Sequence, residues 1–80
     1  MPTKVTEEEL ELRKVLAENI RSYRRLLDLS QEQLADLCGL HRTYVGSVER
    51  CERNVTLSTL IAFANALEVS VPSLLSNKEK

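Results

Sequence analysis

The sequence predicts an all-α domain of five helices, and three observations indicate this fold class. The 80 residues include only two glycines and two prolines. Apolar side chains recur at three- and four-residue steps, which is the helical period. Residues that commonly cap helices precede these apolar runs. We expect one domain over residues 1–80, with a core at about 12–76 and a flexible tail at 77–80.

The first predicted helix runs from about residue 7 to about residue 27. Thr6, followed three residues later by Glu9, is typical of a capping box at a helix start. An apolar stripe of helical period follows, made of Leu12, Leu16, Ile20, Tyr23 and Leu27. This helix is long for the chain, so we expect its first turns to project beyond the core.

The second and third predicted helices are short and lie close together in sequence. Ser30 and Gln33 indicate a second capping box, and Gly39 ends the second helix because glycine favours the left-handed conformation there. After a turn of about three residues, a third helix is predicted at 42–50. Its inward face is expected to carry Val45, Val48 and Glu49. Its outward face is expected to carry Arg42, Thr43, Gly46, Ser47 and Arg50.

The last two predicted helices carry more apolar side chains than one small core needs. Thr56 caps a helix at 57–67, and Ser70 caps a short one with Pro72 in its first turn. A helix that is apolar nearly all round is buried on more than one side. We therefore expect a homodimer, whose interface includes Ile61, Ala62, Val71, Leu74 and Leu75.

The formal net charge is −1 and the pI is near 5.8, which taken whole argues against a nucleic-acid partner. The charge is unevenly distributed, however. Residues 1–12 hold four glutamates against one lysine, whereas residues 13–53 hold eight cationic side chains against six acidic ones. Most of these cations are arginines, which suit bidentate contacts with phosphate and guanine. The middle of the chain is therefore compatible with DNA binding.

Composition also argues against several other classes of protein. No stretch approaches the roughly 20 apolar residues of a membrane span, and the start is unlike a signal peptide. Cys38 and Cys51 are too few for a disulfide scaffold, so we expect a cytoplasmic protein. With His41 as the one histidine and no glycine-rich phosphate loop, we expect no enzyme. We likewise expect no metal, no cofactor and no small-molecule ligand.

Two short helices joined by a turn that contains glycine form a helix-turn-helix unit. The chain resembles the Cro/C1-type (XRE) family over roughly residues 16–75, in the segments SQEQLA at 30–35, Gly39-Leu40, Val45, Val48-Glu49-Arg50, LSTL at 57–60 and ANALEVS at 64–70. Within that family, residues 41–45, Glu49-Arg50 and Arg53-Asn54 are similar to the controller proteins of restriction-modification systems. The resemblance implies a five-helix Cro/C1 (lambda repressor-like) DNA-binding domain, whose helix-turn-helix is formed by the second and third helices. It also implies a homodimeric transcriptional regulator that binds a pseudo-palindromic operator in double-stranded DNA.

The base-reading residues are expected at the start of the third helix. A recognition helix turns its N-terminal side chains toward base edges. Arg42 is the main candidate, because arginine is the commonest reader of guanine; the alternative is an arginine that contacts solvent or phosphate only. Thr43 suits thymine, and Ser47 lies on the same predicted stripe. Tyr44 either contacts the DNA or is half-buried packing.

Other residues are expected to contact phosphate or to support the fold. Arg50, Arg53 and Asn54 follow the third helix, and the resemblance implies a phosphate contact for Gln31. It also implies an ion pair between Glu49, whose inward phase requires a partner, and Arg24. Gly46 is expected to let the helix approach DNA closely. Cys51 stands where the family usually has glycine, so any left-handed backbone there carries a cost.

Two alternatives use the same fold. One is a phage-type repressor, which differs from a controller in its operator and target gene. The other is an antitoxin-like protein-interaction module, for which the sequence offers only the extra N-terminal turns at 5–10 as a partner-binding segment.

Overall fold

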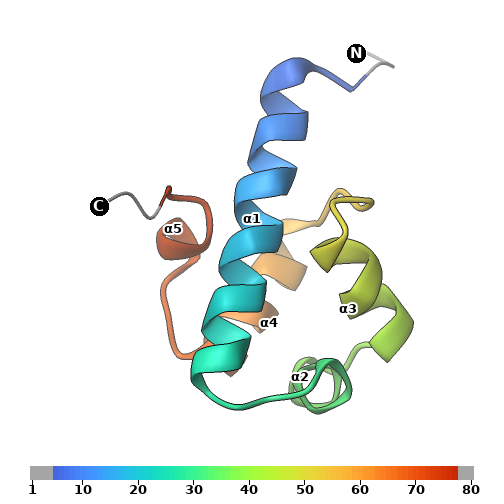
Figure 1. Ribbon diagram of the computed structural model, residues 1–80, viewed down its shortest axis with the longest axis vertical. Coiled ribbons are helices and arrows are strands. Elements are labelled where there is room, and N and C mark those ends of the chain that lie inside the picture. Colours follow the sequence, from blue (N-terminus) through green and yellow to red (C-terminus); the bar gives the residue numbers. More distant parts are fainter. Residues whose placement is uncertain (1–4, 78–80) are drawn as a thin grey trace.

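A computed structural model describes residues 5–77, which form five helices and no strand (Figure 1). The helices are α1 (Glu7–Leu26), α2 (Gln31–Cys38), α3 (Arg42–Glu49), α4 (Leu57–Leu67) and α5 (Val71–Leu74). The predicted all-α class and the order of the elements are confirmed. Of the expected tail at 77–80, only Asn77 lies within the described residues. No described helix is long and apolar enough to cross a membrane.

Side-chain caps fix where four of the helices begin. Thr6, Ser30, Thr56 and Ser70 each accept a hydrogen bond from the backbone N–H three residues later. The box at Ser30 is complete, since Ser30 N also donates to Gln33 Oε1 at 2.8 Å. At Thr6 the expected capping box is only half formed: Thr6 accepts from Glu9 N, but the Glu9 side chain does not return to the Thr6 backbone. The Glu9 carboxylate instead accepts a bond from Arg13 Nη2 at 3.0 Å, one turn further along α1.

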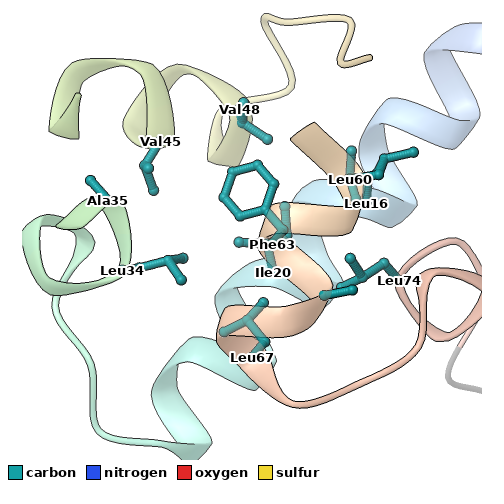
Figure 2. Packing of buried hydrophobic residues seen from close by; sticks show 11 residues of the cluster. Leu16, Ile20, Leu34, Ala35, Val45, Val48, Leu60, Phe63, Leu67 and Leu74 are labelled. Atoms are coloured by element: carbon teal, nitrogen blue, oxygen red, sulfur yellow. The ribbon is translucent and has the colours of Figure 1, made fainter. Parts of the chain in front are cut away.

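The hydrophobic core lies where α1, α2, α3 and α4 meet. Phe63 of α4 is fully buried at its centre, between Ile20 of α1 and Val48 of α3 (Figure 2). Leu34 and Ala35 of α2 and Val45 of α3 complete the side of the core that lies under the helix-turn-helix. Burying a side chain the size of Phe63 stabilises the fold by roughly 1.5–3 kcal/mol. The core therefore packs α3 against the rest of the domain through Val45 and Val48.

The short helix α5 belongs to the core and corrects one expectation. Leu74, predicted at a dimer interface, has no exposed surface and packs against α1 and α4 (Figure 2). Asn19, which is 3% exposed, holds α5 in place. Its Nδ2 donates to Leu74 O at 2.9 Å and to Ser76 O at 2.8 Å. Because Leu74 is enclosed within one chain, no surface remains on it for a second copy.

The other side chains predicted at the interface differ in exposure. Ile61 is 51% exposed, whereas Val71 and Leu75 are partly buried and pack against the core. Ala62 is also partly buried. Leu57, one turn before Ile61 on α4, is 75% exposed. The first turns of α1 extend beyond the other helices, as the sequence predicts (Figure 1).

Candidate nucleic-acid interface

The helix-turn-helix is built from α2, a tight turn and α3. Gly39 adopts the left-handed conformation at φ 70°, and Leu40 N donates to Ala35 O at 2.9 Å, which closes the end of α2. His41 then occupies the N-cap position of α3 and accepts from Val45 N at 3.2 Å through its carbonyl. Val45 and Val48 point into the core (Figure 2). These contacts fix which side of α3 faces outward.

The first turn of α3 presents its side chains to solvent. Arg42 and Thr43 are exposed, and so is the side chain of His41, which makes no capping hydrogen bond. In a recognition helix this is the position that meets base edges. The structure therefore leaves Arg42 and Thr43 accessible at the place where the sequence predicts base reading.

Ser47 does not lie on the outward face of α3, and that expectation is wrong. The residue is 5% exposed. Its Oγ donates to Tyr44 O at 2.7 Å and accepts from Arg53 Nε at 3.1 Å. The loop after α3 folds back over this part of the helix, so the hydroxyl is already engaged within the chain.

Tyr44 and Ser47 together position Arg53. The Arg53 guanidinium carbon lies 5.4 Å from the centroid of the Tyr44 ring, within the range of a cation–π interaction. Tyr44 is half-buried, whereas Arg53 and the neighbouring Asn54 are exposed. The arrangement holds the cationic side chain of Arg53 against Tyr44 and Ser47 of α3, although its backbone lies on the loop after the helix.

A buried ion pair joins α1 to α3. Arg24 Nε lies 2.7 Å from Glu49 Oε2, and Arg24 Nη2 lies 3.0 Å from Glu49 Oε1, so the pair implied by the family resemblance is present. Arg24 Nη1 also donates to Leu29 O at 2.9 Å, and Arg21 donates to Glu49 O. With 3% of the Glu49 side chain exposed, the pair supports the structure from inside.

Gln31, which is partly buried, also contacts this ion pair. Its Nε2 donates to Glu49 Oε1 at 3.0 Å, a contact that the sequence did not predict. Gly46 was expected on the outward face of α3, but it is buried beneath the side chain of Gln31. A Cβ there would lie 3.5 Å from Gln31 Oε1 and 3.2 Å from Arg50 Nη1. Gly46 therefore makes room for two polar side chains that cross α3.

The turn after α3 has the hydrogen bonds of a Schellman motif. Cys51 N donates to Val48 O and Glu52 N donates to Ser47 O, both at 3.0 Å. Cys51 has φ 66°, the left-handed conformation that glycine adopts at least cost. The sequence predicted this cost. The turn places Glu52 beside Arg50, and the hydrogen bond to that carboxylate raises the pKa of Arg50 above its usual value.

Cysteine and potential metal-ligand residues are further candidate sites. Cys38 is partly buried, its Sγ lies 3.6 Å from Ala62 O, and burial raises the pKa of its thiol. Within residues 5–77, no group of three or more His, Cys, Asp and Glu side chains is placed to hold a metal ion.

The fold and the exposed start of α3 define a helix-turn-helix DNA-binding domain. The profile of the helix-turn-helix family HTH_3 matches residues 20–74, and the chain belongs to this Cro/C1-type family. It is accordingly a DNA-binding transcriptional regulator.

Three individual proteins are similar to this chain over most of its length. The chain is 64% identical over 69 residues to control protein C.SmaI from Serratia marcescens, which covers 86% of this chain and 82% of that one. Among solved structures, a hypothetical transcription factor from Neisseria is similar at a TM-score of 0.83 and 44% identity, over 98% of this chain and 88% of that one. The restriction-modification controller C.AhdI from Aeromonas hydrophila is similar at a TM-score of 0.75 and 42% sequence identity. This match covers 78% of this chain and 94% of that one.

Proposed function

We propose that this protein binds a pseudo-palindromic operator as a homodimer and controls a restriction-modification operon. The observation that carries the proposal is the 64% identity to a control protein across most of both chains. The exposed first turn of α3 is consistent with it, because that turn is the part of the fold that meets base edges.

In this proposal Arg42 reads a base and Thr43 supports it. The Arg42 guanidinium is exposed and carries donors that match guanine O6 and N7. Thr43 offers a hydroxyl and a methyl group to a neighbouring base pair. Tyr44 reaches the DNA only with its exposed edge, since its ring lies against Arg53.

Phosphate contacts come from both sides of α3. Arg50, Arg53 and Asn54 are exposed at its carboxyl end. Gln31 stands at the start of α2, where backbone N–H groups and the helix dipole favour an anion. Because the Gln31 side chain is bound to Glu49, we assign its phosphate contact mainly to the backbone N–H. These contacts fix the protein on the duplex without reading its sequence.

The dimer forms through α4 and the segment around α5. Leu57 and Ile61 lie one turn apart on α4 and are both exposed. Ala62, Val71 and Leu75 are partly buried and are proposed to contribute the surface that remains exposed on them. A two-fold axis there would place the two copies of α3 one DNA turn apart, about 34 Å.

Sedimentation equilibrium tests the dimer. The Ile61→Glu variant is expected to be a monomer, because a charge replaces an exposed apolar side chain of the proposed interface. A wild-type monomer at high micromolar concentration would contradict the arrangement.

Two arginine variants test whether Arg42 reads a base while Arg53 contacts only phosphate. Arg42→Ala is expected to weaken operator binding by about 1–3 kcal/mol while changing binding to unrelated DNA little. Arg53→Ala is expected to weaken binding to both duplexes alike and to reduce the salt slope by about one per protomer. Fluorescence anisotropy with the two duplexes measures both effects. Equal losses on both duplexes for Arg42→Ala would remove Arg42 as the base reader.

A further inference from the structure

An exposed ion pair lies on the surface that we propose to face DNA. Arg50 Nε is 3.1 Å from Glu52 Oε2, and Arg50 Nη2 is 3.2 Å from Glu52 Oε1. The two side chains are 60% and 54% exposed. The carboxylate thus binds one complete edge of the guanidinium, in the two-point geometry that a phosphate also uses.

The backbone holds the carboxylate in this place. Glu52 N donates to Ser47 O, and the left-handed Cys51 turns the chain sharply after Arg50. Glu52 is therefore tied to the end of α3 by its main chain. Its side chain reaches the neighbouring arginine across only two residues, so forming the pair requires little ordering of the loop.

The guanidinium itself lies across α3 toward α2. Its Nη1 and Gln31 Oε1 both lie over Gly46, within 3.2 and 3.5 Å of where a Cβ would stand. Arg50 therefore sits between the start of α2 and the end of α3, and both of these places are proposed to contact phosphate. A phosphate that binds Arg50 through its Nε/Nη2 edge would need the place that Glu52 occupies.

We propose that Glu52 is a built-in competitor of the DNA backbone, whose carboxylate occupies the anion position at Arg50 in the free protein. This inference rests on the proposed function, in which the α3 surface binds DNA. A phosphate that takes this edge of Arg50 displaces Glu52 and leaves its negative charge facing the duplex. Glu52 thereby lowers the electrostatic, sequence-independent part of binding, while Arg42 and Thr43, which read bases, are left untouched.

The salt dependence of binding follows from the same exchange. Each phosphate neutralised by a cation releases counterions from DNA. When Glu52 is displaced, its freed carboxylate attracts a cation from solution and offsets part of this release. Removing the carboxylate should therefore tighten binding to any duplex and steepen the slope of log affinity against log salt.

Anisotropy with a labelled duplex of arbitrary sequence tests the inference on the full chain. Glu52→Gln removes the charge and keeps the shape, and it is expected to bind about three-fold more tightly per protomer at low salt. Its salt slope is expected to steepen by up to about one per protomer. Glu11→Gln is the matched control, because Glu11 is exposed on the projecting part of α1 and its loss changes the net charge equally.

The double variant Arg50→Ala/Glu52→Gln shows whether Glu52 acts through Arg50. The gain from Glu52→Gln is expected to be clearly smaller in the Arg50→Ala background, because only the repulsion of the free carboxylate is then removed. The single and the double variants are expected to melt close to the wild-type temperature. An equal gain in that background, an equal gain from Glu11→Gln, or no gain at all overturns the competition. If the wild-type protein binds no duplex, the proposed function fails as well; if it binds and Glu52→Gln changes nothing, only this inference fails.

Discussion

Glu49 and Glu52 lie three residues apart, and each pairs with an arginine, yet the two ion pairs belong to different parts of the molecule. The Glu49 side chain is 3% exposed and its partner Arg24 is 13% exposed, with a shortest contact of 2.7 Å. Glu52 and Arg50 are more than half exposed, and their contact is 3.1 Å. The first pair joins helices inside the domain, whereas the second stands in solvent where a ligand can compete for it.

The difference comes from the surroundings and not from the residue types. Glu49 accepts bonds from Arg24 and Gln31, and three helices enclose it. A buried charge without such partners would be strongly unfavourable. Glu52 follows the left-handed Cys51, which turns the chain out of the core. The same chemistry therefore stabilises the fold at one position and adjusts the surface at the other.

Glu49→Ala is the largest expected effect. It leaves Arg24 and the Gln31 amide without their acceptor inside the domain, so we expect a loss of about 3–5 kcal/mol in the free energy of unfolding. Urea denaturation followed by circular dichroism measures it. Since small domains are stable by only about 5–15 kcal/mol, the variant should be partly unfolded near physiological temperature. A loss below about 1 kcal/mol would contradict a structural role for the pair.

Cys51→Gly is expected to stabilise the protein by about 1 kcal/mol. Glycine adopts φ 66° without the steric cost that a side chain carries there. Thermal denaturation should show a higher melting temperature under reducing conditions. Gly39→Ala is the opposite control, because it adds a side chain at φ 70° with open space around it and should destabilise α2 through the backbone alone. An unchanged melting temperature for Cys51→Gly would contradict a strained turn.

Glu52→Gln is the smallest expected effect on stability. Solvent and salt screen an exposed pair, so the free energy of unfolding should not change measurably in urea. The contrast with Glu49→Ala is the point of the measurement. A large loss of stability in Glu52→Gln would show that both carboxylates support the fold, and the distinction between the two pairs would no longer hold.

Local signals in the sequence predicted most of the fold. Ser30 with Gln33, Thr56 and Ser70 all cap helices where expected, because a capping side chain acts within three residues of its own position. The family resemblance led to the Arg24–Glu49 pair across 25 residues. Arg42 and Thr43 are exposed as the helical phase predicts.

The errors arise where a segment outside a helix folds back on it. Ser47 has an outward phase on α3, but the loop carrying Arg53 covers it. Leu74 was predicted at a dimer interface because the last two helices carry more apolar side chains than one small core needs, yet Asn19 anchors α5 against α1. A polar residue three positions after Leu16, on the apolar stripe of the first helix, was the available signal for that contact. The Arg50–Glu52 pair depends on a turn at Cys51 that spacing alone does not show.

Selection of bound duplexes from a random DNA pool, with wild type and Arg42→Ala in parallel, tests the central claim most directly. The wild-type protein is predicted to enrich an inverted repeat whose half-site centres lie about 10 base pairs apart. Arg42→Ala is predicted to lose the preference at one position in each half-site while still binding DNA. Enrichment of no sequence by the wild type, or of the same repeat with undiminished preference by Arg42→Ala, would contradict the account.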